Sequence, residues 1–318
     1  MKASAIAHPI QGLIKYHGLM DEQLRLPFHD SISVCTAPLV SKTTVEFGHL
    51  NDDVWLGRHK AYGNELERIL SVVDALGDEA GGRPGMRMRT MNNFPSNIGL
   101  GASASGFAAL TLAAASALDL ELSLEELSRF ARRGAGSAAR AVTGGFSRWY
   151  AGDDHSSISK RIPHPENMDM SIVCAIIPTF KTTDLIHQES LTSPFFKARL
   201  DHILPALDCM EESILRGDID EIGYQAETDS LLLHSITMTG KDGTILWRPE
   251  TIQVILEVRD MRKDGIQCYF SIDTGATVYI NCHRSDEFMI KQRMNAIGIE
   301  TIQCSVGGPV MLSYNHLF

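Results

Sequence analysis

A segment rich in glycine and serine, PSNIGLGASASG at residues 95–106, is the clearest candidate for chemistry in this 318-residue chain. Gly99 and Gly101 allow a tight backbone turn, and Ser103 and Ser105 add hydroxyl groups. An alanine-rich segment follows, and the N-terminus of a helix there would offer amide donors and positive potential to a phosphate. The loop is neither a Walker A motif nor a Rossmann fingerprint. It indicates either another kind of phosphate site or a loop before a tightly packed helix.

Three further segments carry charged side chains that could act on a substrate. Lys15 lies in IKYHG, after a short apolar stretch. Arg140 lies among small residues that let the backbone approach a ligand, and its guanidinium could hold a carboxylate with two parallel hydrogen bonds. Asp273 ends a hydrophobic run, where a lone carboxylate is costly unless it is used or paired. Each residue also has a purely structural interpretation, which the sequence leaves open. Lys15 could lie on the surface, the segment of Arg140 could serve helix packing, and Asp273 could form an Asx turn.

The elements that would position these groups are short strands and amphipathic helices in two halves, an α+β pattern. We expect strands at residues 3–8, 31–35, 43–47, 86–91, 146–150, 171–178, 267–272, 277–281 and 301–306. We expect helices at residues 63–76, in the second half of 92–120, after a Ser123–Glu126 capping box, at 195–216 with a kink at Pro205, and at 219–233, 249–263 and 287–297. The polar segment 153–169 places the domain boundary near its end.

Composition excludes several classes of protein. The net charge of -10 argues against a nucleic-acid partner, although a local cationic cluster could still bind an anionic substrate. The six cysteines form no C-x-x-C pair, so we expect neither a zinc site nor a redox motif. We expect the protein to lie in the reducing cytoplasm. The longest apolar run, residues 107–118, is shorter than the roughly 18 residues that span a bilayer. The sequence therefore predicts a soluble cytoplasmic protein with no membrane partner.

Five separated motifs make the chain resemble the mevalonate-decarboxylase family of the GHMP-kinase superfamily. The resemblance covers residues 2–309 and rests on IKYHG with LPFHDSISV, NNFPSNIGLGASASGFAAL, ARRGAGSAARAVTGGF, TSPFFKARL and SIDTGATVYI. It implies an N-terminal ribosomal-protein-S5-domain-2-like domain at 1–168 with the phosphate loop, and a ferredoxin-like domain at 169–318 with the catalytic aspartate. The sequence departs from the family at Ala102, where a loop serine is replaced, and at Leu19, where a lysine is replaced.

The resemblance also implies roles for single residues. Asp273 would take the proton from the 3-hydroxyl or stabilise positive charge at C3, Arg140 would hold the carboxylate that leaves as carbon dioxide, and Lys15 would neutralise phosphate. Substrate-binding positions are Tyr16, Ser137 and Ser193, to which we add His187 as a histidine near Ser193 that could contact phosphate. The phosphate loop would use Gly99, Gly101, Ser103 and Ser105, and no metal-ligating residues are expected.

The motifs look most like those of an archaeal group that decarboxylates 5-monophosphate substrates. We favour conversion of mevalonate 3,5-bisphosphate to isopentenyl phosphate, carbon dioxide and phosphate without a cofactor, because the loop lacks one serine and the composition is not halophilic. The alternative is a phosphomevalonate or diphosphomevalonate decarboxylase that uses ATP and Mg²⁺. Two functions other than decarboxylation remain open. The chain could be a small-molecule kinase with the GHMP fold, or a phosphate-binding protein without catalytic activity. The resemblance also implies a homodimer.

Overall fold

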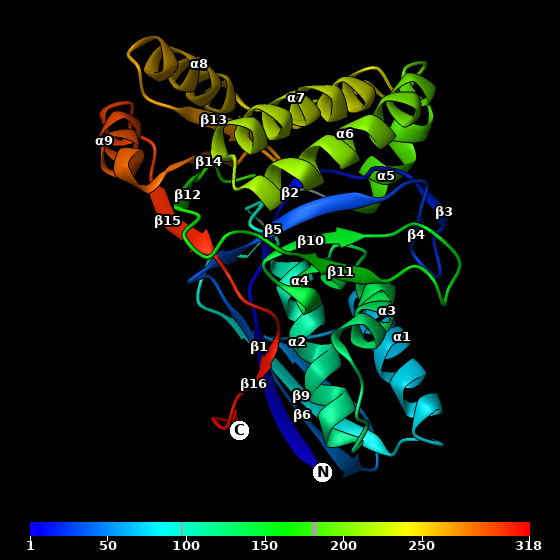
Figure 1. The fold of residues 1–318 in the computed structure, drawn as a ribbon. Helices are drawn as coiled ribbons and strands as arrows, with labels where there is room; N and C mark the ends of the chain where they lie inside the picture. Colours follow the sequence, from blue (N-terminus) through cyan, green and yellow to red (C-terminus); the bar gives the residue numbers. More distant parts are fainter. Residues whose placement is uncertain (97, 180–182) are drawn as a thin grey trace.

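The computed structural model describes residues 1–96, 98–179 and 183–318 (Figure 1). These residues fold into two large sheets with helices packed against them, and a small two-stranded sheet of β3 (Leu19–Asp21) and β4 (Leu26–Pro27). The first sheet has the strand order β16 (Met311–Leu312), β1 (Lys2–Ala7), β6 (Ser41–His49), β9 (Gly85–Asn92), β7 (Asp53–Leu56) and β8 (His59–Lys60). Against it lie α1 (Gly63–Glu79), α2 (Ala102–Ala117), α3 (Leu124–Gly134) and α4 (Ala138–Thr143).

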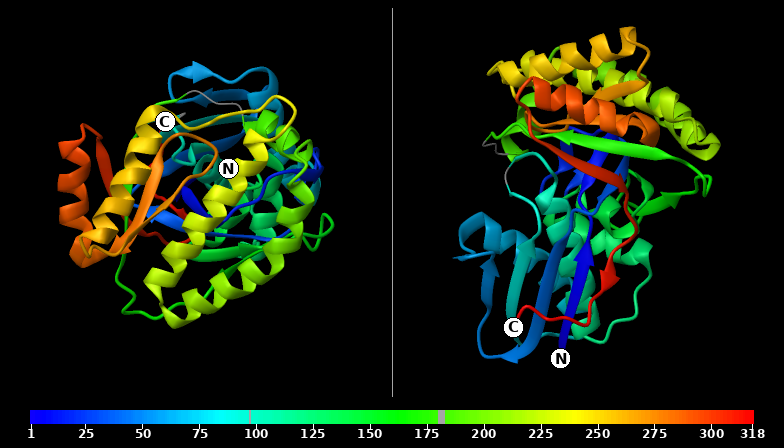
Figure 2. Two further views of the ribbon diagram at one scale, coloured as in Figure 1. Left: turned by 90° about the horizontal axis from the view of Figure 1, so that it is seen from above. Right: turned by 90° about the vertical axis from the view of Figure 1, so that its left-hand side faces the viewer.

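The second sheet runs through both halves of the sequence. Its order is β11 (Ser159–Ile162), β10 (Phe146–Trp149), β5 (Ser31–Ala37), β15 (Thr301–Val306), β12 (Met170–Ala175), β14 (Val278–His283) and β13 (Cys268–Ser271), with β2 (Ile10–Ile14) paired to β5. Around it lie α5 (Thr183–Leu191), α6 (Phe196–Arg216), α7 (Ile219–Met238), α8 (Pro249–Lys263), η1 (Arg284–Asp286) and α9 (Glu287–Ala296). Figure 2 shows α6, α7 and α8 covering one end of the molecule, away from the two termini.

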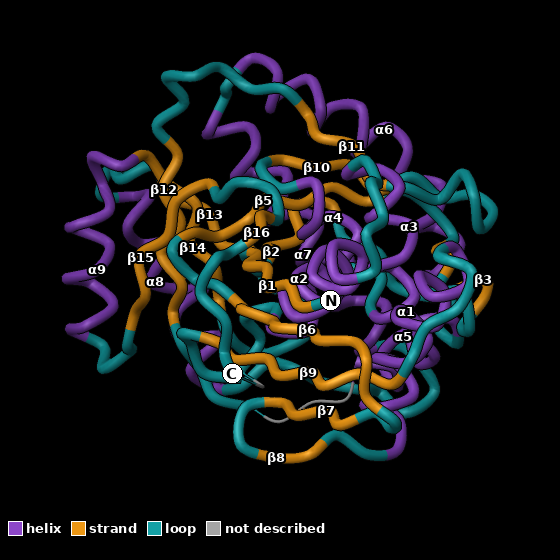
Figure 3. Tube along the Cα trace, turned by 90° about the horizontal axis from the view of Figure 1, so that it is seen from below, coloured by secondary structure: helices purple, strands orange, loops and turns teal. Residues whose placement is uncertain are grey.

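Strands from the two halves of the sequence pair with each other across the domain boundary predicted between residues 168 and 169. Strands β5 and β15 pair through Thr36 and Val306, so the sheet is continuous across that boundary. Strand β16 returns to β1 in the first sheet, which places the C-terminal segment beside the N-terminal strand (Figure 3). The division into 1–168 and 169–318 stays a prediction about how the halves fold. Their strands form two adjacent groups in one sheet, which meet where β5 pairs with β15.

Helix α2 shows why an alanine-rich sequence is useful at this place. Ala108, Ala109 and Ala113 are fully buried, and the helix packs on β1 and β6. Because the alanine side chains are small, the backbone of α2 can lie close to these two strands. The helix is therefore buried without large side chains in between. The helix begins directly at the glycine-serine loop, which fixes the loop against the first sheet.

The expected strands and helices are found within a few residues of their predicted bounds, and α8 and β15 match them completely. Helix α6 continues through Pro205, so the proline does not end it. The sequence analysis did not anticipate the short elements β2, β3, β4, β7, β8, β16, α4, α5 and η1, nor the strand β11 inside the polar segment before residue 169. No described helix is long and apolar enough to cross a membrane.

Ser123 and Glu126 form the predicted capping box at the start of α3. The Glu126 amide donates to Ser123 Oγ at 3.2 Å, and the Ser123 amide donates to Glu126 Oε2 at 2.8 Å. We expect Ser123→Ala to lower the free energy of unfolding by about 1 kcal/mol, because an amide of the first turn loses its acceptor. Urea denaturation would measure this, with Glu126→Gln as the matched control that keeps an acceptor and should lose less. Equal losses for the two variants would contradict the capping role.

Candidate active site

A cavity of about 350 Å³ gathers most of the residues predicted from the sequence. Its walls include Lys15, Tyr16, Gly99, Gly101, Ser103, Ser137, Arg140, His187 and Asp273. A second cavity, of about 570 Å³ between α5 and residues 241–246, contains none of them. The larger space is not the candidate site, because none of the predicted residues lines it and size alone does not define a site.

Asp273 is held at the cavity wall by the other half of the chain. It lies two residues after β13, and its Oδ1 accepts a hydrogen bond from the Gly12 amide of β2 at 3.0 Å. A Cβ atom at Gly12 would lie 3.0 Å from this Oδ1 and 2.8 Å from Lys15 Cγ, so the contact needs glycine. A local Asx turn would not require this long-range contact. The Gly12 amide therefore fixes the position of the carboxylate.

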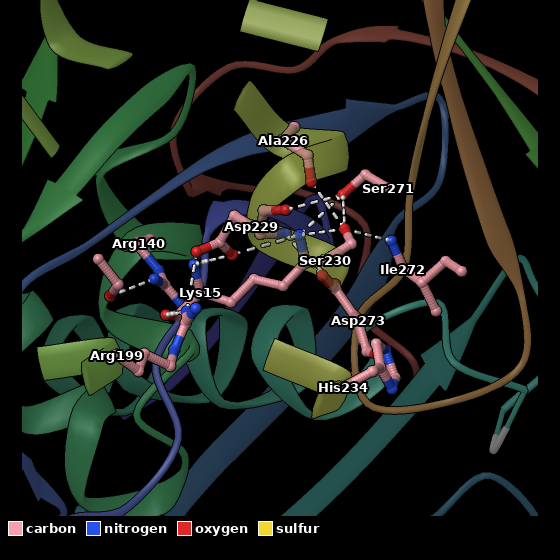
Figure 4. A network of polar contacts seen from close by, with 12 residues as sticks. Lys15, Arg140, Arg199, Ala226, Asp229, Ser230, His234, Ser271, Ile272 and Asp273 are labelled. Atoms are coloured by element: carbon pink, nitrogen blue, oxygen red, sulfur yellow. Dashed lines mark hydrogen bonds and ion pairs between the residues drawn. The ribbon is translucent and has the colours of Figure 1, made fainter. Parts of the chain in front are cut away.

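Lys15 is buried beside Asp273, which excludes the surface-lysine interpretation. Its side chain is 5% exposed, and Nζ donates to Ser230 Oγ and Ser271 Oγ at 2.9 Å each. Burial lowers the pKa of Lys15, while the nearby Asp229 and Asp273 carboxylates raise it. Figure 4 shows Lys15 extended between Asp229 and these two hydroxyl groups. The ammonium group therefore has a fixed position and little water around it.

A buried ion pair fixes the backbone of Lys15. Arg199 Nη2 donates to Asp229 Oδ1 at 2.8 Å and to the Lys15 carbonyl at 2.7 Å. Asp229 Oδ2 accepts from the Lys15 amide at 2.9 Å. The sequence analysis included Arg199 only as part of TSPFFKARL and did not assign it a role. We call Arg199 and Asp229 the lysine clamp, because together they hold both backbone polar groups of Lys15.

Arg140 is presented by the short helix α4. It is 3% exposed, donates to Ser31 Oγ, and its guanidinium carbon lies 5.4 Å from the centre of the Tyr16 ring and 5.7 Å from that of Trp149. Burial lowers the pKa of Arg140, although Asp273 raises it. A guanidinium held by aromatic faces suits a planar carboxylate, because its donors are already oriented.

Tyr16 and His187 form one aromatic group with their neighbours. The Tyr16 ring meets Trp149 edge-on at 4.8 Å and stacks on His187 at 5.2 Å. The Gly18 amide donates to His187 Nδ1 at 3.2 Å, so a neutral His187 carries its proton on Nε2. His187, which the sequence alone connected only to the Ser193 segment, therefore belongs to the cavity wall and could donate to an anion there.

The glycine-serine loop ends at the N-terminus of α2. Gly99 and Gly101 have φ angles of 87° and 71°, and Gly101 precedes the first residue of the helix. Tyr279 donates its hydroxyl to the Gly99 carbonyl at 2.9 Å, so β14 anchors the loop. The first amides of a helix have no intrahelical acceptor, and the first residues of α2, Ala102 and Ser103, line the cavity. The described loop residues therefore fit a phosphate group.

Two predicted site residues do not line the cavity. Ser105 is fully buried, and its Oγ lies 2.6 Å from Ser41 Oγ, so it packs α2 against β6. Ser193 Oγ lies 2.7 Å from Thr239 Oγ1 and accepts from the Phe195 amide at 3.2 Å, so it orders the start of α6. The geometry thus corrects the grouping of these serines with ligand-binding residues, because both hydroxyl groups serve packing contacts.

Several cavity residues were not predicted. They are Arg25, Asn64, Glu65, Arg68 and Thr274. Their sequence signals were weak, because isolated polar residues at the start of a helix or in a turn usually face solvent. Among the described residues no group of three or more His, Cys, Asp or Glu side chains could hold a metal ion.

Comparison with known proteins gives one consistent result. Residues 7–159 match the family model of the diphosphomevalonate decarboxylase-like N-terminal domain. The chain is 46% identical to phosphomevalonate decarboxylase of Haloferax volcanii over 97% of both chains. It is 30% identical to diphosphomevalonate decarboxylase of Saccharomyces cerevisiae, over 70% of this chain and 62% of the yeast protein.

Solved structures agree with these relatives. Mevalonate diphosphate decarboxylase from Staphylococcus aureus superposes with a TM-score of 0.93 at 29% identity over 98% of both chains. The enzyme from Enterococcus faecalis, described with ATP binding mediated by mevalonate diphosphate, gives a TM-score of 0.91 at 27% identity over 98% of this chain and 99% of that one. The expected GHMP-kinase fold is thereby confirmed.

Proposed function

This chain belongs to the diphosphomevalonate decarboxylase family and is a carboxy-lyase for a phosphorylated mevalonate, and we propose that its substrate is phosphomevalonate, used with ATP and Mg²⁺. The products are isopentenyl phosphate, carbon dioxide, ADP and phosphate. The observation that carries the proposal is one cavity in which Asp273, Lys15 and Arg140 lie together with a phosphate-binding loop. The name and 46% identity of the Haloferax volcanii relative support the choice of substrate.

The choice of ATP follows from the chemistry of this substrate. Phosphomevalonate has a free hydroxyl at C3, and hydroxide is a poor leaving group. ATP supplies the phosphoryl group that makes the 3-oxygen able to leave. The α2 N-terminus, with Gly101 and Ser103, is the part of the cavity that would hold its phosphates, and Mg²⁺ would accompany them.

Three charged residues of the cavity have different roles in the reaction. Asp273 accepts the proton of the 3-hydroxyl as that oxygen is phosphorylated and passes the proton on to the new phosphate group. Ionised again, its carboxylate faces the positive charge that develops as the C3–O bond breaks. Arg140 orients the C1 carboxylate, so that breaking of the C1–C2 bond releases carbon dioxide and its electrons form the C2=C3 double bond. Lys15 supplies a fixed positive charge beside Asp273. The site is largely buried, which strengthens each of these interactions.

The ATP-independent reaction that the sequence favoured is the second candidate, and Ala102 is the observation that supports it. Ala102 is the first residue of α2 and lines the cavity, so a hydroxyl group that the family offers there is lacking. With mevalonate 3,5-bisphosphate the leaving phosphate is already in place, and the same three charged residues would serve the elimination. The homodimer and the cytoplasmic location remain predictions in either case.

Release of carbon dioxide distinguishes the two reactions. We expect release from phosphomevalonate only when ATP and Mg²⁺ are both present. Release from mevalonate 3,5-bisphosphate without nucleotide, at an equal or higher rate, would transfer the proposal to the second candidate. Transfer of phosphate to a product that keeps its carboxylate would identify a kinase instead. Diphosphomevalonate with ATP is the matched control for substrate choice and should react more slowly.

A further inference from the structure

Helix α7 lies along an edge of β13 that pairs with no other described strand. Strand β13 is the last strand of its sheet and pairs with β14 on its other side. At the edge that faces α7, the Phe270 amide donates to Glu227 Oε2 at 3.3 Å. The Ile272 amide donates to Ser230 Oγ at 3.0 Å. Side chains of a helix therefore bind the backbone groups that a neighbouring strand would otherwise bind.

His234 continues this row of contacts to Asp273. Its Nε2 lies 3.1 Å from the Asp273 carbonyl oxygen, and because a carbonyl only accepts, Nε2 carries the proton and donates it (Figure 4). From residue 227 to residue 234 a helix rises about 10 Å, which is also the length of about three residues of an extended strand. We propose that His234 is a positioning residue, which serves the reaction by fixing the backbone of Asp273. The inference rests on the proposed function for the role of Asp273, which is the same for both candidate substrates.

Asp273 is held at two places by elements far apart in the sequence. Its carboxylate accepts from the Gly12 amide of β2 at 3.0 Å, and its carbonyl accepts from His234 of α7. The carbonyl also accepts from the Gly275 amide at 2.9 Å, but that bond lies within the turn and would move with it. Because β13 ends at Ser271, the ladder of the sheet does not reach Asp273. The contact with α7 therefore fixes the turn in space, and a misplacement of about 1 Å at a reacting group can cost about 10²-fold in rate.

The same helix also positions Lys15. Ser230, one turn before His234, accepts from Lys15 Nζ at 2.9 Å, and Asp229 Oδ2 accepts from the Lys15 amide at 2.9 Å. The His234 ring is fully buried, and its centre lies 5.0 Å from that of the Trp247 ring, which limits its rotation. One helix thus sets the position of the cation relative to that of the carboxylate.

Two amide side chains of different length test this role. The Nε2 of a glutamine can take the place of the histidine Nε2, whereas asparagine is one methylene shorter and does not reach the Asp273 carbonyl. We expect His234→Asn to lower kcat about tenfold to a hundredfold and to leave the Kd of the substrate within about threefold, because Arg140 and the phosphate loop still bind it. His234→Gln should recover most of the kcat. Single-turnover release of carbon dioxide would measure this, with whichever candidate substrate the wild type decarboxylates. His202→Asn, at an exposed site on α6, is the matched control and should change neither value.

A purely structural role would give a different pattern. No loss of kcat in His234→Asn, or equal losses in His234→Asn and His234→Gln, would overturn the assignment, because the donor would then not matter. In an Asp273→Asn background, His234→Asn should have no further effect on kcat, since the carboxylate that it places is absent. A loss by the same factor in both backgrounds would also overturn the assignment. His234→Leu fills the volume of the ring without a donor, so it takes the place of His234→Asn if that variant does not fold.

Hydrogen exchange at the Gly12 amide reports on the same contact without turnover. This amide donates to Asp273 Oδ1, so His234→Asn should speed its exchange about tenfold relative to that of the Val173 amide in β12. His234→Gln should leave the exchange near the wild-type rate. Unchanged exchange in His234→Asn would overturn the positioning role. Faster exchange in a protein whose wild type releases no carbon dioxide from either substrate would support that role and refute the proposed function alone.

Discussion

Asp273→Asn should lower kcat by roughly 10²–10⁴-fold while the protein stays folded. Asparagine keeps the shape and can still accept the Gly12 amide through its oxygen, so the contact between β2 and the end of β13 survives. What is lost is the negative charge, and with it both the acceptor for the 3-hydroxyl proton and the stabilisation of positive charge at C3. Single-turnover release of carbon dioxide from phosphomevalonate, with ATP and Mg²⁺, would measure the loss.

Two controls make this result interpretable. Asp201→Asn removes an exposed carboxylate of α6 outside the cavity and should leave kcat unchanged. The melting temperature of Asp273→Asn should lie close to that of the wild type. If the variant kept wild-type kcat, Asp273 would have no part in the chemistry and the proposed mechanism would be wrong. The same measurement with mevalonate 3,5-bisphosphate would show whether the proton transfer or the charge stabilisation dominates, because that substrate has no 3-hydroxyl proton.

Breaking the lysine clamp should produce the largest loss of stability. Arg199 and Asp229 have side chains 2% and 3% exposed, and each also bonds the backbone of Lys15. Asp229→Asn leaves Arg199 buried without its counter-charge, which costs about 3–5 kcal/mol of unfolding free energy. Arg199→Met should cost less, because Asp229 keeps its ion pair with Lys15 Nζ at 3.7 Å. Activity should fall as well, because Lys15 loses its fixed backbone position.

A double-mutant cycle in urea would measure the coupling. The double variant Arg199→Met with Asp229→Asn should lose less than the sum of the single losses, because Arg199 is then no longer buried without its counter-charge. The exposed pair Arg216–Glu212, with side chains 57% and 69% exposed, is the matched control and should show a coupling below about 0.5 kcal/mol. Additive losses at Arg199 and Asp229 would mean that the two residues stabilise the fold independently.

Local signals in the sequence were sufficient for most elements and for the motifs of the site. The Ser123–Glu126 capping box and Pro249 at the start of α8 act within one helical turn, so residue types and spacing predict them. The glycine-serine loop before an alanine-rich helix is also a local pattern. Helix α4 was missed because its small residues, AARAVT, carry no amphipathic periodicity, and it forms because α2 and α3 pack against it.

The sequence by itself therefore identified the residues that we propose carry the chemistry, namely Lys15, Arg140, Asp273 and the loop glycines, because their motifs are short and contiguous. Only the tertiary structure decided how they meet. The Gly12–Asp273 contact joins residues 261 positions apart, and the lysine clamp joins Lys15 to Asp229 across 214 positions. Long-range packing also directed the hydroxyl of Ser105 into a helix–strand contact and placed Arg25 at the cavity. Such partners depend on how sheets and helices are assembled, and the spacing of residues along the chain does not specify that assembly.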